Sequence, residues 1–249
     1  MDSLIVVVAL GAIAAGFVQG LSGFGFGLVA MSFWAWTVEP QLAAVLAVFG
    51  SLAGQLLAVL TVKRRVEAHR LLPFVLGGVL GVPIGVWLLP MLDANLFKAV
   101  LGALLVTWGP AMLLARQLPR IRRGGRVADG LVGAVGGVMG GIGGFTGSVP
   151  TLWCTLRGFD KDTQRAVIQN FNLATLAVAF GIYLARGFVT SAMLPMLAIV
   201  AAALALPALL GARLYIGISE TTFRQIVLGL LTLSGVALLA SSVPRLIGV

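Results

Sequence analysis

The sequence predicts an all-α polytopic membrane protein made of two homologous halves, arranged as inverted repeats. Three observations lead to this fold class: a shortage of charge, two glycine-dense segments that repeat, and an uneven distribution of Lys and Arg. The chain has 249 residues, of which 59% are hydrophobic and only 10% are charged, and its mean hydropathy is +1.07. A soluble domain carries about 25% charged residues. Most of the surface must therefore face lipid.

The membrane spans follow from the gaps between charged residues. A helix needs about 20 apolar residues to cross a bilayer. Six charge-free stretches have roughly that length, and the spans built on them are predicted at 41–62, 71–92, 96–115, 166–185, 188–212 and 223–244, with Lys98 and Arg224 near the ends of two of them. Each half is thus expected to contain three transmembrane helices that follow a different kind of segment.

That different segment is rich in glycine and is predicted to be a broken or re-entrant helical hairpin, over 4–37 in the first half and 130–156 in the second. Positions 11–27 hold six glycines and positions 130–147 hold nine of the chain's 33. Glycine destabilises a continuous helix by close to 1 kcal/mol per position relative to Ala. It also permits backbone conformations that other residues avoid.

The two halves are copies of each other. At a constant offset of 120, four glycines of the first half (Gly16, Gly20, Gly23 and Gly27) fall on Gly136, Gly140, Gly143 and Gly147. Further along, residues 44–50 align with 166–172 at an offset of 122. The expected organisation is a first repeat over 1–115, a basic cytoplasmic linker over 116–128 and a second repeat over 129–249.

The charge distribution favours inverted halves. The formal net charge is +9, which we assign to cytoplasmic loops rather than to nucleic-acid binding, because Lys and Arg collect in such loops. If each glycine-rich segment returns to its starting side, 14 Lys and Arg lie inside and only Lys98, Arg186 and Arg245 lie outside. If each crosses once, the halves are parallel and the numbers are 11 and 6. In the inverted arrangement both termini are expected outside. The apolar amino terminus is expected to be retained, because no basic residue precedes it.

Catalysis, metal binding and cofactors are not expected. The chain has one cysteine, Cys154, and one histidine, His69, too few for a Cys or His metal cluster. Ser22 lies between glycines but lacks the pattern of a serine nucleophile. No charged position lies deep in any predicted span, so a ligand would have to be held by neutral dipoles. A helix that begins at membrane depth offers unpaired N–H groups and a positive dipole end, which suit an anion.

The candidate substrate-binding residues are the clustered glycines and the polar or aromatic residues beside them. They are Gly20, Ser22, Gly23, Phe24, Gly25, Gly27, Gln55, Gly140, Gly143, Gly144, Phe145, Thr146, Gly147, Ser148, Gln169, Asn170 and Asn172. Gln19 and Thr151 are polar neighbours of the same glycines. For four of the glycines another interpretation stays open, because the four-residue spacings of Gly16–Gly20 and Gly136–Gly140 also fit helix packing. Asn170 and Asn172 cannot share one helix face, so one of them is expected to be structural.

The repeated segments GFVQGLSGFGFGLVAMSF (16–33) and GGVMGGIGGFTGSVPTLW (136–153) resemble the TauE/SafE family, also called the sulfite exporter family. The resemblance covers essentially the whole chain. It implies a multi-pass protein of the bacterial inner membrane that moves sulfite, sulfonates or other small organic anions. The family's motif falls on Gly20, Gly23, Gly25 and Gly27, and again on Gly140, Gly143, Gly144 and Gly147. The first copy lacks a proline corresponding to Pro150.

The resulting hypothesis is a secondary transporter for a small anion, with the lipid bilayer as its surroundings. Two alternatives stay open: a non-transporting assembly or scaffold subunit, and a passive anion channel. A homo-oligomer is compatible with the sequence. The coupling ion also stays open. Proton coupling would have to use Glu39, Asp160 or Asp162 at the interfaces, and driving by the membrane potential alone is the other hypothesis.

Overall fold

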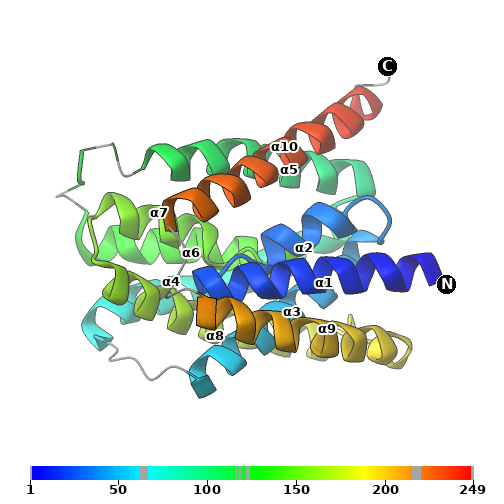
Figure 1. Ribbon diagram of the computed structural model, residues 1–249, viewed down its shortest axis with the longest axis horizontal. Helices are drawn as coiled ribbons and strands as arrows, with labels where there is room; N and C mark the ends of the chain where they lie inside the picture. The colour runs from blue at the N-terminus through cyan, green and yellow to red at the C-terminus, as the bar shows by residue number, and fades with distance from the viewer. Residues whose placement is uncertain are drawn as a thin grey trace.

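The computed structural model describes residues 2–61, 67–115, 117, 119–121, 124–214 and 220–247, and within them all regular structure is helical. Ten α-helices and two short 3-10 helices follow one another (Figure 1). They are α1 (Asp2–Ser22), α2 (Phe26–Trp34), α3 (Pro40–Thr61), α4 (Ala68–Leu88), η1 (Leu89–Met91), α5 (Ala94–Leu114), α6 (Gly125–Gly143), α7 (Ser148–Leu156), α8 (Lys161–Ala185), η2 (Ser191–Met193), α9 (Leu194–Leu214) and α10 (Glu220–Leu246).

Each glycine-rich segment consists of a long helix, a break and a short helix. The first break separates α1 from α2 and contains Gly23 and Gly25, whose φ angles are +82° and +93°. The second separates α6 from α7 and contains Gly144, with φ +76°. Residues with a Cβ avoid this left-handed region, at a cost of about 1–2 kcal/mol each. The glycines therefore allow α1 and α6 to end at the two breaks.

The two halves close on each other through reciprocal helix pairs. The second long helix after each break packs along the first helix of the other half, so that α4 lies on α6 and α9 lies on α1. Equivalent helices of the two halves also pair, α5 with α10 and α3 with α8. Both termini lie at one end of the molecule; α1 runs inward from that end and α6 from the opposite end (Figure 1).

Glycine allows the closest of these helix contacts. A Cβ added to Gly81 of α4 would lie 2.1 Å from the Ala134 carbonyl oxygen of α6, and one added to Gly20 of α1 would lie 2.0 Å from the Ala208 oxygen of α9. Gly16 likewise lies against the backbone of Leu204. Gly16 and Gly20 thus serve helix packing, as small residues commonly do in membrane proteins. The equivalent glycines of α6, Gly136 and Gly140, instead lie against Thr146 in the second break.

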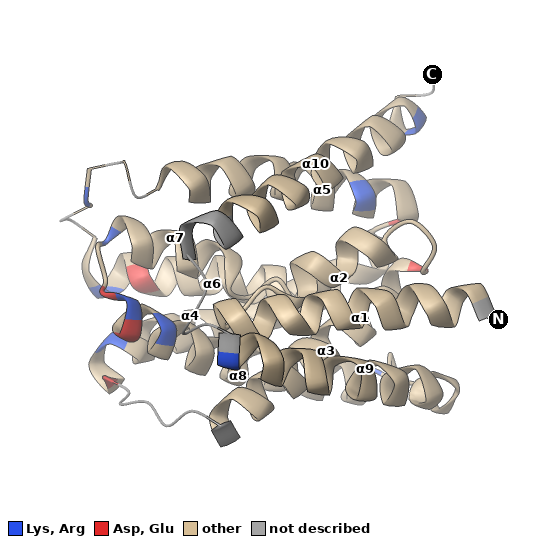
Figure 2. Cartoon of the chain, in the orientation of Figure 1, with Lys and Arg blue, Asp and Glu red and all other residues tan. Residues whose placement is uncertain are grey.

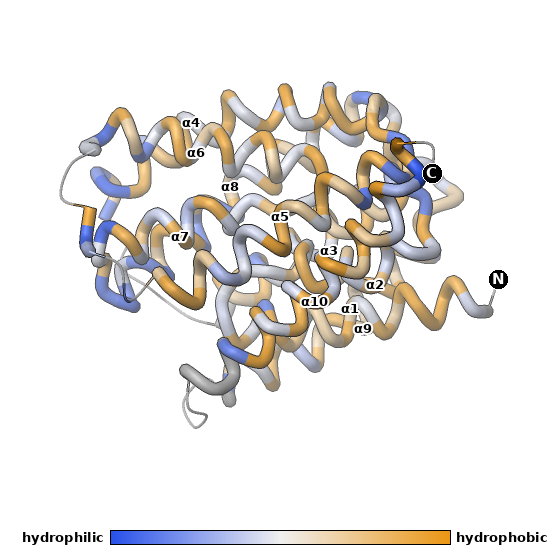
Figure 3. Tube along the Cα trace, turned by 90° about the horizontal axis from the view of Figure 1, so that it is seen from above, coloured by the Kyte–Doolittle hydropathy of each residue, from blue (hydrophilic) through white to orange (hydrophobic). Residues whose placement is uncertain are grey.

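The outer surface has the character of a protein embedded in lipid. Seven helical segments of the described chain are long and apolar enough to cross a membrane, belonging to α1, α3, α4 with η1, α5, α8, α9 and α10. The α3 and α8 spans are 56% and 50% buried, against 22% for α9, so α3 and α8 form the centre. Large apolar side chains face outward, such as Leu80 (74% exposed). Hydrophobic residues run along the helices and hydrophilic ones gather towards their ends (Figure 3). The chain is a multi-pass membrane protein.

Lys and Arg gather at the end of the molecule opposite the two termini (Figure 2). Part of the basic sequence predicted there, Arg116, Arg122, Arg123 and residues 62–66, lies outside the described residues. The helix α6 begins at Gly125, inside the stretch predicted as linker. Asp129 lies in the first turns of this helix, where its carboxylate is stabilised by a hydrogen bond from Trp153 Nε1 at 2.7 Å.

Candidate functional site

The two helix breaks, one from each half, meet in the centre of the molecule. A Cβ added to Gly27, at the start of α2, would lie 2.7 Å from the carbonyl oxygen of Gly144 and 3.0 Å from that of Gly143. One added to Gly147 would lie 3.2 Å from Cβ of Phe24. Segments about 120 residues apart in the sequence are therefore in direct backbone contact, and only residues without a side chain permit it.

A small cavity lies where the breaks meet. Its lining comes from α1, α2, α3, α7, α8 and both breaks: Gln19, Phe24, Gly25, Phe26, Leu28, Ser51, Gln55, Gly144, Phe145, Thr146, Gly147, Ser148, Asn172 and Leu176. The volume open to the centre of a water molecule is about 10 Å³, which is room for about one water. In this conformation the breaks are closed on each other, so a larger ligand requires them to separate.

The cavity faces the N-termini of two helices. Gly25 and Phe26 bring the start of α2 to it, and Gly147 and Ser148 bring the start of α7. The first N–H groups of a helix have no partner inside that helix and carry the positive end of its dipole. Two such ends directed at one space favour negative charge there.

The predicted site residues fall into two groups. Those that line the cavity are Phe24, Gly25, Gln55, Gly144, Phe145, Thr146, Gly147, Ser148 and Asn172. Those outside its lining are Gly20, Ser22, Gly23, Gly27, Gly140, Gly143, Gln169 and Asn170. Within the second group, Gly27 and Gly143 form the contact between the breaks, and Gln169 lies beside Gly23, with its amide nitrogen 3.1 Å from the position of an added Cβ.

The predicted serine hydroxyls are occupied by local hydrogen bonds. Ser148 Oγ donates to the carbonyl oxygen of Phe145 at 2.7 Å. Ser22 Oγ lies 2.7 Å from the Val18 oxygen and 2.5 Å from the Phe24 oxygen. Both serines therefore stabilise the turns of the breaks.

The two asparagines differ in their surroundings. The amide nitrogen of Asn170 donates to the Ala166 oxygen of its own helix at 2.8 Å. Asn172 is 2% exposed, lines the cavity, and its Oδ1 has no hydrogen-bond partner in the protein. Of the two asparagines, Asn172 therefore reaches the cavity and Asn170 does not.

Two residues beside the breaks were not among the sequence-predicted candidates. Trp108 of α5 donates from Nε1 to the Ser148 oxygen at 2.8 Å, and its ring meets that of Phe24 edge-on at 6.0 Å. Arg165 precedes the predicted span 166–185, yet its guanidinium donates to the Gly20 oxygen at 3.1 Å. A positive charge thus reaches the end of α1, although the sequence predicted no charged position deep in a span. The sequence signal for Arg165 is its position one helical turn before Gln169.

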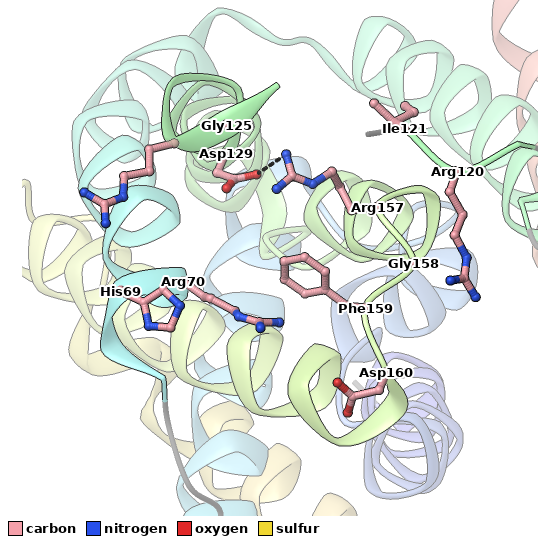
Figure 4. Close-up of a pocket in the computed structure, with 11 residues that line it drawn as sticks. His69, Arg70, Arg120, Ile121, Gly125, Asp129, Arg157, Gly158, Phe159 and Asp160 are labelled. Atoms are coloured by element: carbon pink, nitrogen blue, oxygen red, sulfur yellow. Dashed lines mark ion pairs between the residues drawn. The ribbon is translucent and has the colours of Figure 1, made fainter. Parts of the chain in front are cut away.

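A second, larger pocket of about 670 Å³ lies at the basic end of the molecule. Four arginines (Arg70, Arg120, Arg126 and Arg157) line it together with His69 and two acids, Asp129 and Asp160. In Figure 4, Arg70 and Arg157 lie on two sides of Phe159. The excess of guanidinium groups attracts anions.

The two acids of this pocket are already engaged. Asp129 pairs with Arg157 at 3.8 Å. Asp160 caps α8 by accepting from the Thr163 N–H at 2.9 Å. The hydrogen bonds from the Thr163 backbone and side chain lower the pKa of Asp160 below its ordinary value of 3.8, so that it stays ionised at neutral pH.

The family model of the sulfite exporter TauE/SafE matches residues 8–238 of the chain. The match includes both helix breaks and all the helices that pack around them. Among curated proteins and solved structures, no match to the chain is found.

Proposed function

Because the chain belongs to the TauE/SafE sulfite exporter family, we propose that it is a secondary transporter that moves sulfite, a sulfonate or a related small anion across the bacterial inner membrane. The anion binds where the two helix breaks meet, between the N-termini of α2 and α7. The observation that carries this proposal is the contact between the breaks, at Gly27 with Gly144 and at Phe24 with Gly147. Arg165 adds positive charge beside the first break.

The two halves lie in the membrane as inverted repeats, each with a re-entrant hairpin. The reciprocal packing of α4 on α6 and of α9 on α1 supports this arrangement. So does the gathering of Lys and Arg at the end opposite the termini (Figure 2), which the positive-inside rule assigns to the cytoplasm. Alternating access then follows from movement of one half against the other around a fixed site.

The large basic pocket is the cytoplasmic entrance for the anion. It lies at the far end of α7 from the breaks, and that nine-residue helix is about 13 Å long. The pocket's arginines raise the local concentration of anions. The closed breaks stop passive leakage, which favours a transporter over an open channel.

The test is substrate flux in proteoliposomes of the purified protein, with sulfite, sulfate, thiosulfate, sulfoacetate, taurine, lactate and chloride as candidate substrates. We expect saturable movement of sulfite or a sulfonate. Asn172→Ala should lower the flux by roughly tenfold, the loss of one hydrogen bond from the Asn172 amide N–H to the bound anion. Asn170→Ala, whose amide bonds only to its own helix, is the matched control and should leave flux nearly unchanged.

Two other outcomes would favour the alternative functions. Flux without saturation or counterflow would indicate a passive anion channel. Silence with every anion, from protein that is folded and inserted, would favour a scaffold or assembly subunit instead.

A further inference from the structure

The first half contributes two glutamines whose amide groups have a fixed orientation. Gln19 of α1 donates from Nε2 to the Ser51 carbonyl oxygen at 2.9 Å, and Gln55 of α3 donates from Nε2 to the Gly23 oxygen at 3.0 Å. Turning either amide over would place its oxygen against a carbonyl oxygen. The remaining polar atom of each amide is therefore Oε1, which can only accept a hydrogen bond.

These two oxygens are buried and lack a partner. Gln19 and Gln55 line the cavity between the breaks and are 3% and 2% exposed, and the Oε1 of each has no hydrogen-bond partner in the protein. Ser51 Oγ and Asn172 Oδ1 share that property, but a hydroxyl or an asparagine amide also carries a donor. Buried polar atoms are almost always paired, because leaving them unpaired is costly. The two glutamines therefore call for a ligand group that donates a hydrogen bond.

The two acceptors keep their orientation when the breaks separate to admit an anion. Both hydrogen bonds that fix Gln19 and Gln55 join α1, α3 and the first break, which all belong to the first half. The contacts that must part, such as Gly27 with Gly144, join the two halves. Movement of one half against the other therefore leaves both glutamine oxygens in place.

The cavity thus sets two requirements for its ligand. The starts of α2 and α7 favour negative charge, whereas the glutamine oxygens favour a hydrogen-bond donor on the same ligand. An anion without a donor would turn its own lone pairs towards them. We propose that Gln19 and Gln55 form an acceptor site for an O–H group of the transported anion, so that the protein selects a monoanion that carries its own donor.

This inference narrows the substrate class and rests on the proposed function. The transported species is hydrogen sulfite rather than sulfite, or a hydroxyalkyl sulfonate rather than an alkyl sulfonate. A site built to bond a hydroxyl group of its substrate discriminates against an analogue that lacks the hydroxyl, because the buried groups of the site are then left unpaired.

Binding is tested with two sulfonates of equal charge, hydroxyethanesulfonate and propanesulfonate, in which a methyl group replaces the hydroxyl. The thermal unfolding temperature of the purified protein is measured as each is added, since a ligand that binds only the folded state stabilises that state. Hydroxyethanesulfonate should bind roughly tenfold more tightly. Gln55→Met removes one acceptor and should bring the two affinities close together. Gln164→Met, whose Nε2 donates to Thr155 Oγ1 at 3.1 Å outside the cavity, should keep the full preference.

Sulfite provides a second test that needs no variant, because it takes up a proton near neutral pH. Among the described residues that line the cavity, none has a titratable side chain, and the Arg165 guanidinium beside the first break stays charged. The stabilisation given by a fixed total concentration of sulfite, relative to protein without sulfite at the same pH, should therefore grow as the pH is lowered through neutrality. That given by propanesulfonate should stay constant.

Equal affinities for the two sulfonates, or a sulfite response that grows as the pH is raised, would overturn the inference and leave the glutamine oxygens to a water molecule. The flux of the same anions in proteoliposomes separates this failure from failure of the proposed function. Sulfonates that move equally well would keep the transporter and refute the acceptor site. Selective binding of the donor-bearing anions without any flux would refute the transporter and keep the site.

Discussion

At the scale of single residues, the site depends on positions where a side chain is excluded. Gly144 combines a left-handed backbone with close packing, because an added Cβ would lie 3.2 Å from the Ala47 carbonyl oxygen. Gly187 has nearly the same φ, +71°, but an added Cβ would meet nothing within 4 Å. Comparing substitutions at Gly144 and Gly187 therefore distinguishes the cost of backbone strain from damage to the site.

We expect Gly144→Ala and Gly187→Ala each to lose about 1–2 kcal/mol of stability from the left-handed backbone, and Gly144→Ala somewhat more from crowding. Only Gly144→Ala should lose the stabilisation that added sulfite gives. Thermal unfolding of both variants with and without sulfite measures this. A sulfite response that is intact in Gly144→Ala would contradict binding at the breaks.

At the scale of helices, the spacing of charged residues predicts the positions of six helices, whereas the contacts between helices depend on tertiary packing. The helices α3, α4, α5, α8, α9 and α10 lie over the six charge-free spans, because lipid excludes charge along a crossing. The sequence does not reveal that α1 continues through Gly16 and Gly20, because the backbone of α9 supplies the packing there. It also cannot place Ser51, Trp108 and Arg165 at the breaks, since those contacts join residues far apart in the chain.

The packing of α4 on α6 makes a prediction of its own. Gly81→Ala places a methyl group 2.1 Å from the Ala134 oxygen and should destabilise the protein by about 1–3 kcal/mol. Gly229→Ala in α10 meets no neighbour within 4 Å and should be neutral or stabilising by up to about 1 kcal/mol. Unfolding of the two variants in the same detergent compares them. Equal stabilities would show that this helix contact is looser than the structure indicates.

At the scale of the whole molecule, the duplication is symmetric in its backbone but not in its chemistry. Equivalent helices pair across the two halves, and both breaks reach the same cavity. The polar side chains of its lining differ between the halves: Gln19, Ser51 and Gln55 come from the first, and Thr146, Ser148 and Asn172 from the second. The duplicated backbone thus brings two helix starts to one cavity, while each half lines it with different polar side chains. Our proposal of inverted repeats requires that the two halves enter the membrane from opposite sides.

The measurement that tests this requirement most directly is cysteine labelling in intact cells with a membrane-impermeant maleimide. Cys154, the single buried cysteine, is first replaced by Ala, and one cysteine is then introduced at Lys98, Lys161 or Arg186. Inverted halves predict labelling at 98 and 186 from outside, and at 161 only after the cells are opened. Labelling at 161 but not at 186 in intact cells would mean parallel halves, and would contradict the arrangement on which the anion site depends.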